Sequence, residues 1–107
     1  MSRLAAALLM SLPLAVLAAG EQEFNLSIEN HKFAPDRIEV PAGKKVKLLV
    51  ENKDATPEEF ESHELKIEKV IPGKSKATIF VGPLKAGEYK FVGEFNEKTA
   101  KGVIVAK

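Results

Sequence analysis

Apolar and polar residues alternate along most of the chain. Phe24, Leu26 and Ile28 are separated by polar residues, and this period of two is typical of a half-buried β-strand. The same alternation recurs in short segments at residues 37–40, 46–50, 64–68, 76–81, 89–92 and 103–105. No segment has a sustained helical period. The pattern therefore predicts seven or eight short strands and an all-β fold.

Glycine and proline separate these predicted strands, in turns at residues 41–44, 72–75 and 82–87. Short strands at regular spacing with such turns predict an antiparallel Greek-key β-sandwich. A single helical turn is expected at residues 56–60, because Thr56 is a suitable cap and Pro57 suits the first helical position. The remaining polar stretch before His63 is expected to be a loop.

The start of the chain breaks the alternating pattern. Arg3 supplies one positive charge, residues 4–19 are almost wholly apolar, and the segment ends in small residues. These features predict a secretory signal peptide over residues 1–19. A membrane anchor is the alternative, but the run contains Pro13 and is shorter than the roughly 20 residues that a spanning helix needs. We therefore expect one mature domain at residues 20–107, located in the periplasm, with no membrane span.

Charge and sulfur content narrow the possible functions. The chain has 16 Lys and Arg against 15 Asp and Glu, and loss of Arg3 with the signal peptide would leave it formally neutral. Proteins that bind nucleic-acid phosphates normally have a basic excess, so no nucleic-acid partner is expected. Cysteine is absent, and both methionines, Met1 and Met10, lie in the signal segment. The mature domain therefore offers no sulfur ligand, the type that favours Cu(I).

Few residues could carry chemistry. The chain has two histidines, His31 and His63, and His63 lies in the run Pro57-Glu58-Glu59-Phe60-Glu61-Ser62-His63-Glu64. Imidazole and carboxylate groups together are suitable ligands for first-row metals. The alternative is a solvated acidic loop with a surface histidine, and His31 is equally compatible with a polar turn. The chain has neither the G-x-S-x-G motif of a hydrolase nor a glycine-rich phosphate loop, so an enzyme with its own substrate is the least favoured reading.

The order of these features resembles the cupredoxins. The resemblance runs from Phe24 to Lys107 and implies a cupredoxin-like sandwich. It is carried by residues 33–44, 46–52 and 102–105, by the G-x-Y-x-F segment at 87–91, and by Ser62-His63-Glu64, which matches the place of the first histidine ligand.

This chain departs from the blue-copper members at their metal loop. Those proteins have Cys, His and Met there, whereas Gly93 holds the place of the Cys and Asn96 that of the second His. The Met place falls near Ala100. Three of the four type-1 copper ligands are therefore absent and only His63 remains of the set, so we expect no blue copper centre.

A closer resemblance is to the EfeO-type cupredoxin-like proteins of bacterial periplasmic iron uptake. It is carried by residues 54–64 and by Gly93-Glu94-Phe95. It implies a copper or iron site of histidines and carboxylates that supports iron oxidation or transfer. That subgroup has histidine at the position of Asn96, and an amide oxygen is a poorer copper ligand than imidazole.

The resemblance also places His31 at the metal-bearing end, because His31 lies two residues before Phe33. We therefore expect four side chains to converge there, with two further carboxylates at the rim. The four are His31, His63, Glu94 and Asn96, and the rim residues are Glu59 and Glu61.

Two functions are compatible with these observations. The first is a periplasmic metal-handling protein that binds Cu(II) or iron and supports ferrous-iron oxidation or transfer, with an iron permease or another periplasmic protein as partner. The second is a metal-free cupredoxin-fold module that docks a protein partner. An enzymatic role would be at most auxiliary, in iron oxidation or electron transfer.

Overall fold

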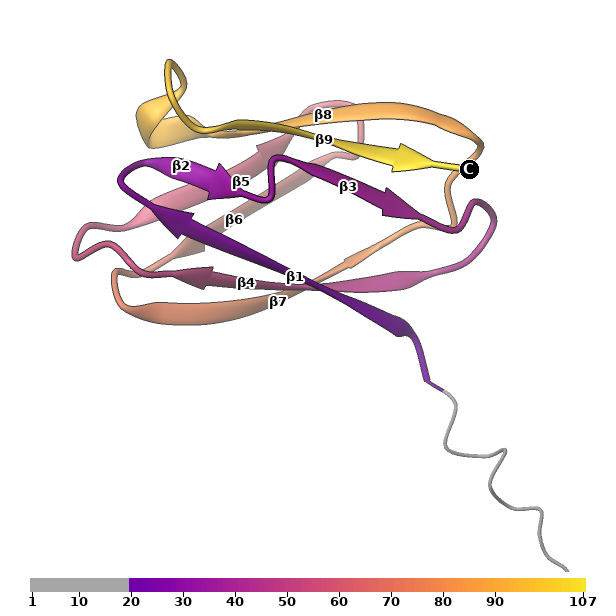
Figure 1. Ribbon diagram of the computed structural model, residues 1–107, viewed down its shortest axis with the longest axis horizontal. Helices are drawn as coiled ribbons and strands as arrows, with labels where there is room; N and C mark the ends of the chain where they lie inside the picture. The colour runs from indigo at the N-terminus through magenta and orange to yellow at the C-terminus, as the bar shows by residue number, and fades with distance from the viewer. Residues whose placement is uncertain (1–19) are drawn as a thin grey trace, which may run out of the picture.

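The structure is a computed structural model that describes residues 20–107, so the predicted signal peptide lies outside the described residues. The described chain consists of short strands and one 3-10 turn, η2 (Figure 1). The elements are β1 (Gln22–Glu29), β2 (Lys32–Ala34), β3 (Arg37–Val40), β4 (Val46–Asn52), β5 (Glu58–Ser62), β6 (Ile67–Ile71), β7 (Ser75–Val81), β8 (Gly87–Gly93), η2 (Glu94–Asn96) and β9 (Lys101–Ala106). No helix among these residues has the length and apolar character needed to cross a membrane.

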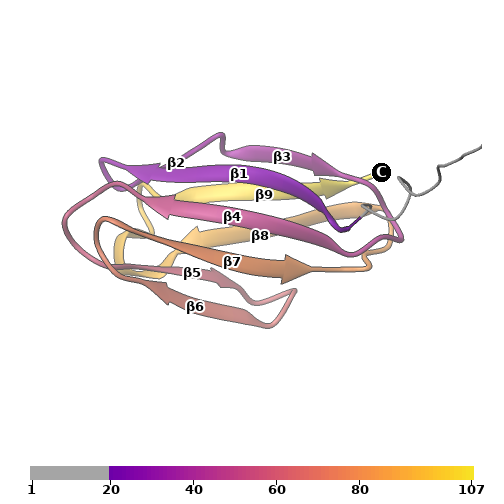
Figure 2. The ribbon, with the colours of Figure 1, turned by 90° about the horizontal axis from the view of Figure 1, so that it is seen from below.

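The strands form two stacked sheets, which confirms the predicted β-sandwich. One sheet has the order β2-β1-β4-β7 and the other the order β3-β9-β8-β5-β6, and the two layers are seen in Figure 2. Each sheet contains one parallel pair, β1 with β4 and β3 with β9. The sheets are therefore mixed, which corrects the expectation of purely antiparallel pairing. β1 and β4 are not joined by a hairpin, because the chain passes through β2 and then through β3 in the second sheet before it returns to the first sheet as β4.

Three phenylalanine rings fill the core between the sheets. Phe60 and Phe91 are stacked with their centroids 4.8 Å apart, and Phe33 meets Phe91 edge-on at 4.9 Å. All three side chains are buried. Such aromatic contacts add to the stabilisation from buried area, so this cluster fixes the spacing of the two sheets near β5, β8 and η2.

The main difference from the predicted elements is at β5. The expected helical turn at 56–60 is wrong, because the segment from Glu58 to Ser62 is a strand between β6 and β8. Its partner β6 begins at Ile67, later than the predicted strand at 64–68. Four of the five β5 residues are polar, which hides their alternation. Since Phe60 belongs to the core, Glu58 also faces inward, whereas Glu59 and Glu61 face outward.

Candidate metal site

The structure places the two histidines in turns of different sheets, His31 between β1 and β2 and His63 after β5. His31 lies in the β1–β2 turn, at the end of the sandwich that also carries η2 (left in Figure 1). β5 starts at that end, because the backbone N–H of Phe95 in η2 donates to the side chain of Glu58. The strand then carries the chain away, and His63 follows it in the turn to β6. This corrects the expectation that the two histidines converge.

His31 is held in its turn by Asp54. The backbone N–H groups of Asn30 and His31 donate to the Asp54 carboxylate at 2.8 and 3.0 Å. Both turn residues have positive φ, 55° and 59°, and the carboxylate compensates their exposed N–H groups. The hydrogen bond from His31 is the main reason that the pKa of Asp54 lies below its ordinary value. The exposed imidazole lies 3.8 Å from Asp54, so its carboxylate neighbour among residues 20–107 is a residue that was not among the predicted ligands.

The other predicted residues gather on the outer face of the five-stranded sheet, except Asn96. Glu59 and Glu61 project outward from β5, and Glu94 follows β8 directly alongside, since Gly93 pairs with Phe60. Glu94 interacts with both β5 carboxyl groups. The outer-face cluster, as we call it, consists of Glu59, Glu61, His63 and Glu94; His63 Nε2 lies 3.7 Å from Glu61 Oε2.

Negative charge in this cluster is poorly compensated. Burial and then the hydrogen bond and charge of Glu94 raise the pKa of both Glu59 and Glu61 above the ordinary value, while nearby His63 opposes the shift at Glu61. The Glu61 side chain is only 5% exposed, yet within residues 20–107 it accepts no hydrogen bond from an N–H or hydroxyl group, and no Lys or Arg pairs with the three carboxylates. Crowded carboxylates of this kind are typical of sites that receive a cation.

These shifts predict how stability changes with pH in the absence of metal. A carboxyl group with a raised pKa in the folded state stabilises the fold when protonated, and that contribution is lost as pH rises through the folded-state pKa. Glu61→Gln should therefore be more stable than wild type at pH 7. The difference should vanish below about pH 4, where unfolded glutamate is also protonated. Urea denaturation at several pH values tests this; a less stable variant at pH 7 would show that the carboxylates do not repel one another.

Glu58 is a site residue that the sequence analysis did not single out. Its side chain is buried, and its carboxylate accepts hydrogen bonds from the backbone N–H of Glu59 and of Phe95, both at 2.9 Å, and from Asn96 Nδ2 at 2.8 Å. It also touches Gly93, where a Cβ would lie 2.6 Å from Glu58 Cδ. The interior place that the resemblance assigned to Cys and His is thus filled by a hydrogen-bonded carboxylate. Its two-residue spacing from Phe60 is the sequence signal that indicates an inward side chain.

No three His, Asp or Glu side chains among residues 20–107 already surround a common point suited to a metal ion. The outer-face cluster is therefore an open arrangement of donors. Glu61 is fixed by burial, whereas Glu94 and His63 are exposed and have rotamers available to turn toward it. Both carboxylate oxygens of Glu58 already accept hydrogen bonds, from two backbone N–H groups and from Asn96 Nδ2, so the outer face is where the residues fit a cation better.

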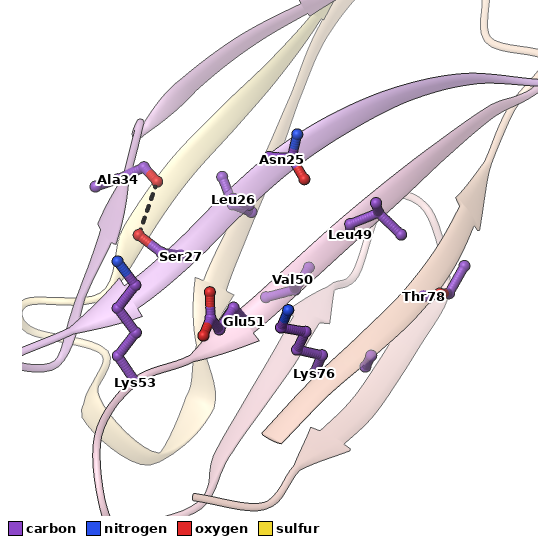
Figure 3. Close-up of a pocket in the computed structure, with 11 residues that line it drawn as sticks. Asn25, Leu26, Ser27, Ala34, Leu49, Val50, Glu51, Lys53, Lys76 and Thr78 are labelled. Atoms are coloured by element: carbon purple, nitrogen blue, oxygen red, sulfur yellow. Dashed lines mark hydrogen bonds between the residues drawn. The ribbon is translucent and has the colours of Figure 1, made fainter. Parts of the chain in front are cut away.

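A separate groove of about 480 Å³ crosses the outer face of the four-stranded sheet (Figure 3). It is lined by polar residues such as Ser27, Glu51 and Lys76, and Ser27 Oγ donates to the carbonyl of Ala34 at its edge. None of the predicted metal ligands lines it. The groove and the outer-face cluster therefore lie on opposite faces of the sandwich.

The cupredoxin-like domain family matches residues 2–106. This chain belongs to that family. Among curated proteins, this cupredoxin-like chain is 42% identical to an uncharacterized protein, RP394, of Rickettsia prowazekii (strain Madrid E), over 83 residues. The match covers 78% of this chain and 66% of the relative, so the chain spans slightly less than two thirds of the relative's length.

Solved structures show the same fold at low sequence identity. Auracyanin A, a blue copper protein from Chloroflexus aurantiacus, is 13% identical with a TM-score of 0.69, covering 82% of this cupredoxin-like chain and all of its own. The metal-binding domain of the Cu(I)-exporting ATPase CopA from Streptococcus pneumoniae D39 is 19% identical with a TM-score of 0.70, covering 91% of each chain. An apo copper-binding protein reaches a TM-score of 0.72 at 18% identity, covering 83% of this chain and 90% of its own. At these identities the similarity shows the fold alone.

Proposed function

We propose that this cupredoxin-like protein is a metal-handling protein that binds a divalent cation, Cu(II) or Fe(II), at the outer-face cluster. The observation that carries the proposal is Glu61, a nearly fully buried carboxylate that lies beside Glu94, shares the outer face of β5 with Glu59, and has no N–H donor among the described residues. A bound cation would compensate all three charges at once. The copper-binding proteins of similar fold support a metal role without locating it in this chain.

The ligand types determine which ions suit the cluster. Three carboxylates and one imidazole favour Fe(II) and Cu(II), whereas Cu(I) prefers thiolate and thioether sulfur. Residues 20–107 contain neither Cys nor Met. The proposal therefore includes the absence of type-1 copper, with Glu58, Gly93 and Asn96 at the interior position where that centre would need sulfur and imidazole.

We further propose a role in iron uptake in the periplasm, with an iron permease or another periplasmic protein receiving the ion. Support comes from the signal-peptide pattern at residues 1–19 and from the resemblance of residues 54–64 to the EfeO-type proteins. Transfer of Fe(II) needs no electron acceptor. Oxidation of Fe(II) to Fe(III) needs one, and bound Cu(II) would take the electron and become Cu(I).

If the protein is exported, its predicted signal peptide should be removed. Cleavage near Ala19 should leave a chain that begins at about Gly20 in the periplasmic fraction. Intact-mass spectrometry of fractionated cells tests this. A chain that keeps Met1 and stays with the membrane would overturn the periplasmic assignment while leaving the cation site untested by that result.

Cation binding itself is tested by isothermal titration of the purified protein with Cu(II) and, without oxygen, with Fe(II). Wild type should bind one ion, and Glu61→Gln should lower the affinity by at least about tenfold, because a neutral amide replaces the central ligand. Glu88→Gln is the matched control, since Glu88 is an exposed glutamate that contacts Arg37 at the other end of β8. Absence of binding by wild type, or equal losses in both variants, would contradict the proposed site.

One observation favours the second candidate function, a metal-free module that docks a partner. Phe95 is a large apolar side chain that is 51% exposed, directly after Glu94. If wild type binds neither ion while Phe95→Ser loses capture of a periplasmic partner, the docking module is the better account.

A further inference from the structure

We propose that Glu58 is a positioning residue for the outer-face cluster. Its buried carboxylate holds η2 against β5, so that Glu94 lies beside Glu59 and Glu61. This inference rests on the proposed function, because it concerns how the same cation site is assembled. Glu58 itself faces the interior, and its side chain meets the outer-face cluster only at the backbone N–H of Glu59; it acts on the cluster through Glu94.

The Glu58 carboxylate is buried and depends on N–H donors. The side chain is 2% exposed, and no Lys or Arg among the described residues pairs with it. Its three hydrogen bonds, at 2.8 to 2.9 Å, all come from N–H donors. A buried carboxylate without an opposite charge needs such donors to remain favourable. Two of the three, Phe95 N and Asn96 Nδ2, belong to η2.

Side-chain hydrogen bonds between η2 and β5 are few. The first turn of η2 has no side-chain cap. Its remaining backbone hydrogen bonds are local, since the N–H groups of Thr99 and Ala100 both donate to the carbonyl of Asn96. Within residues 20–107, the side-chain hydrogen bonds that join η2 to β5 both end on Glu58. The pairing of Gly93 with Phe60 fixes where η2 begins, and beyond that point the hydrogen bonds that hold η2 over β5 are those to this one carboxylate.

η2 carries one carboxylate of the outer-face cluster. Glu94 is the first residue of η2 and directly precedes Phe95, whose N–H is held by Glu58. The Glu94 carboxylate lies against Glu59 and Glu61, and these like charges repel one another. An unrestrained η2 would move Glu94 away from them. The hydrogen bonds to Glu58 oppose that movement and keep the three carboxylates together before a cation arrives.

The test compares Cu(II) affinity, by isothermal titration, with thermal stability. Glu94→Ala should lower the affinity by about tenfold or more with no loss of stability. Glu58→Ala should lower both, and the affinity loss should match that of Glu94→Ala. The double variant should bind no more weakly than Glu94→Ala alone, because residues that act through one another are not additive. A Glu58→Ala protein that melts earlier but binds Cu(II) like wild type would overturn the proposal.

Ser62→Ala is the matched control for a purely structural effect. Ser62 is a buried polar residue on the same inner face of β5, and its hydroxyl donates to the Lys90 carbonyl at 2.8 Å and accepts from Leu65 N. Its loss should lower stability without changing Cu(II) affinity. An equal affinity loss in this control would show that any damage to β5 weakens binding, and the specific role of Glu58 would be wrong.

A conservative variant keeps the test valid if Glu58→Ala does not fold. In Glu58→Gln the side-chain oxygen can still accept hydrogen bonds from the backbone N–H groups of Glu59 and Phe95. The new amide N–H can donate to the side-chain oxygen of Asn96, once the Asn96 amide has turned over. Glu58→Gln and Glu58→Gln/Asn96→Asp should therefore bind Cu(II) like wild type. Weak binding by both would contradict positioning by hydrogen bonds. If Glu61→Gln and Glu94→Ala bind Cu(II) like wild type, the cation site itself is wrong. Failure of the site can therefore be distinguished from failure of the Glu58 positioning role.

Discussion

Gly102→Ala should destabilise the domain by about 3 kcal/mol, the upper end of the usual range for over-packing. A Cβ at position 102 would lie 2.2 Å from Cζ of the Phe91 ring and 2.6 Å from Cε1. The ring cannot withdraw, because Phe60 stacks on it at 4.8 Å and Phe33 meets it at 4.9 Å. Glycine opposite an aromatic residue on a neighbouring strand thus leaves room for the ring. Urea denaturation of wild type and variant measures the effect.

Two further variants identify the cause of this loss. Gly20→Ala should be neutral, because a Cβ there meets nothing within 4 Å. Phe91→Leu/Gly102→Ala should be more stable than the sum of its single changes predicts, because the smaller side chain leaves space for the methyl group. Strict additivity would show that contact between the Gly102 position and the Phe91 ring is not responsible.

Gly93→Ala should be similarly damaging, by about 3 kcal/mol, for a different reason. The added Cβ would lie 2.6 Å from Glu58 Cδ, 2.7 Å from Glu58 Oε2 and 2.7 Å from Ala100 Cβ. The carboxylate would have to leave its three N–H donors, and a buried charge without hydrogen bonds is strongly unfavourable. Chemical denaturation measures the loss.

The Glu58→Ala/Gly93→Ala double variant is the control, because it removes the side chain that the new methyl group meets. It should lose less stability than the two single changes together. Equal or greater loss in the double variant would assign the damage to Ala100 and the β8–β9 connection, rather than to Glu58.

Most of the fold follows from local alternation, whereas the pairing of the strands does not. Strands such as β1 and β4 could be predicted because their apolar residues repeat every second position and are buried on one face. Their parallel pairing depends on contacts between distant segments, which local patterning does not specify. β5 was missed because its inward positions include Glu58 and Ser62, polar residues that resemble a solvated loop until their buried partners are known.

The types of residue in the candidate site could be predicted from the sequence, whereas their arrangement in space could not. The sequence indicated Glu59, Glu61 and Glu94 as carboxylates near a metal loop, and the pairing of Phe60 with Gly93 brings them onto one face. The sequence did not show that His63 and His31 lie apart, because their separation depends on where β5 ends relative to the β1–β2 turn. Glu58 was missed as a site residue because its role depends on N–H donors in η2, 37 and 38 residues further along the chain.

The most direct test of the cation site is to locate a paramagnetic ion by NMR. Substoichiometric Cu(II) added to the ¹⁵N-labelled protein broadens amide resonances near the bound ion. The account predicts early loss of the signals of Glu59, Glu61 and Glu94, with those of His31 and Asn30 retained. Broadening centred on the His31 turn instead, or uniform weak broadening over the whole domain, would contradict a cation site on the outer face of β5.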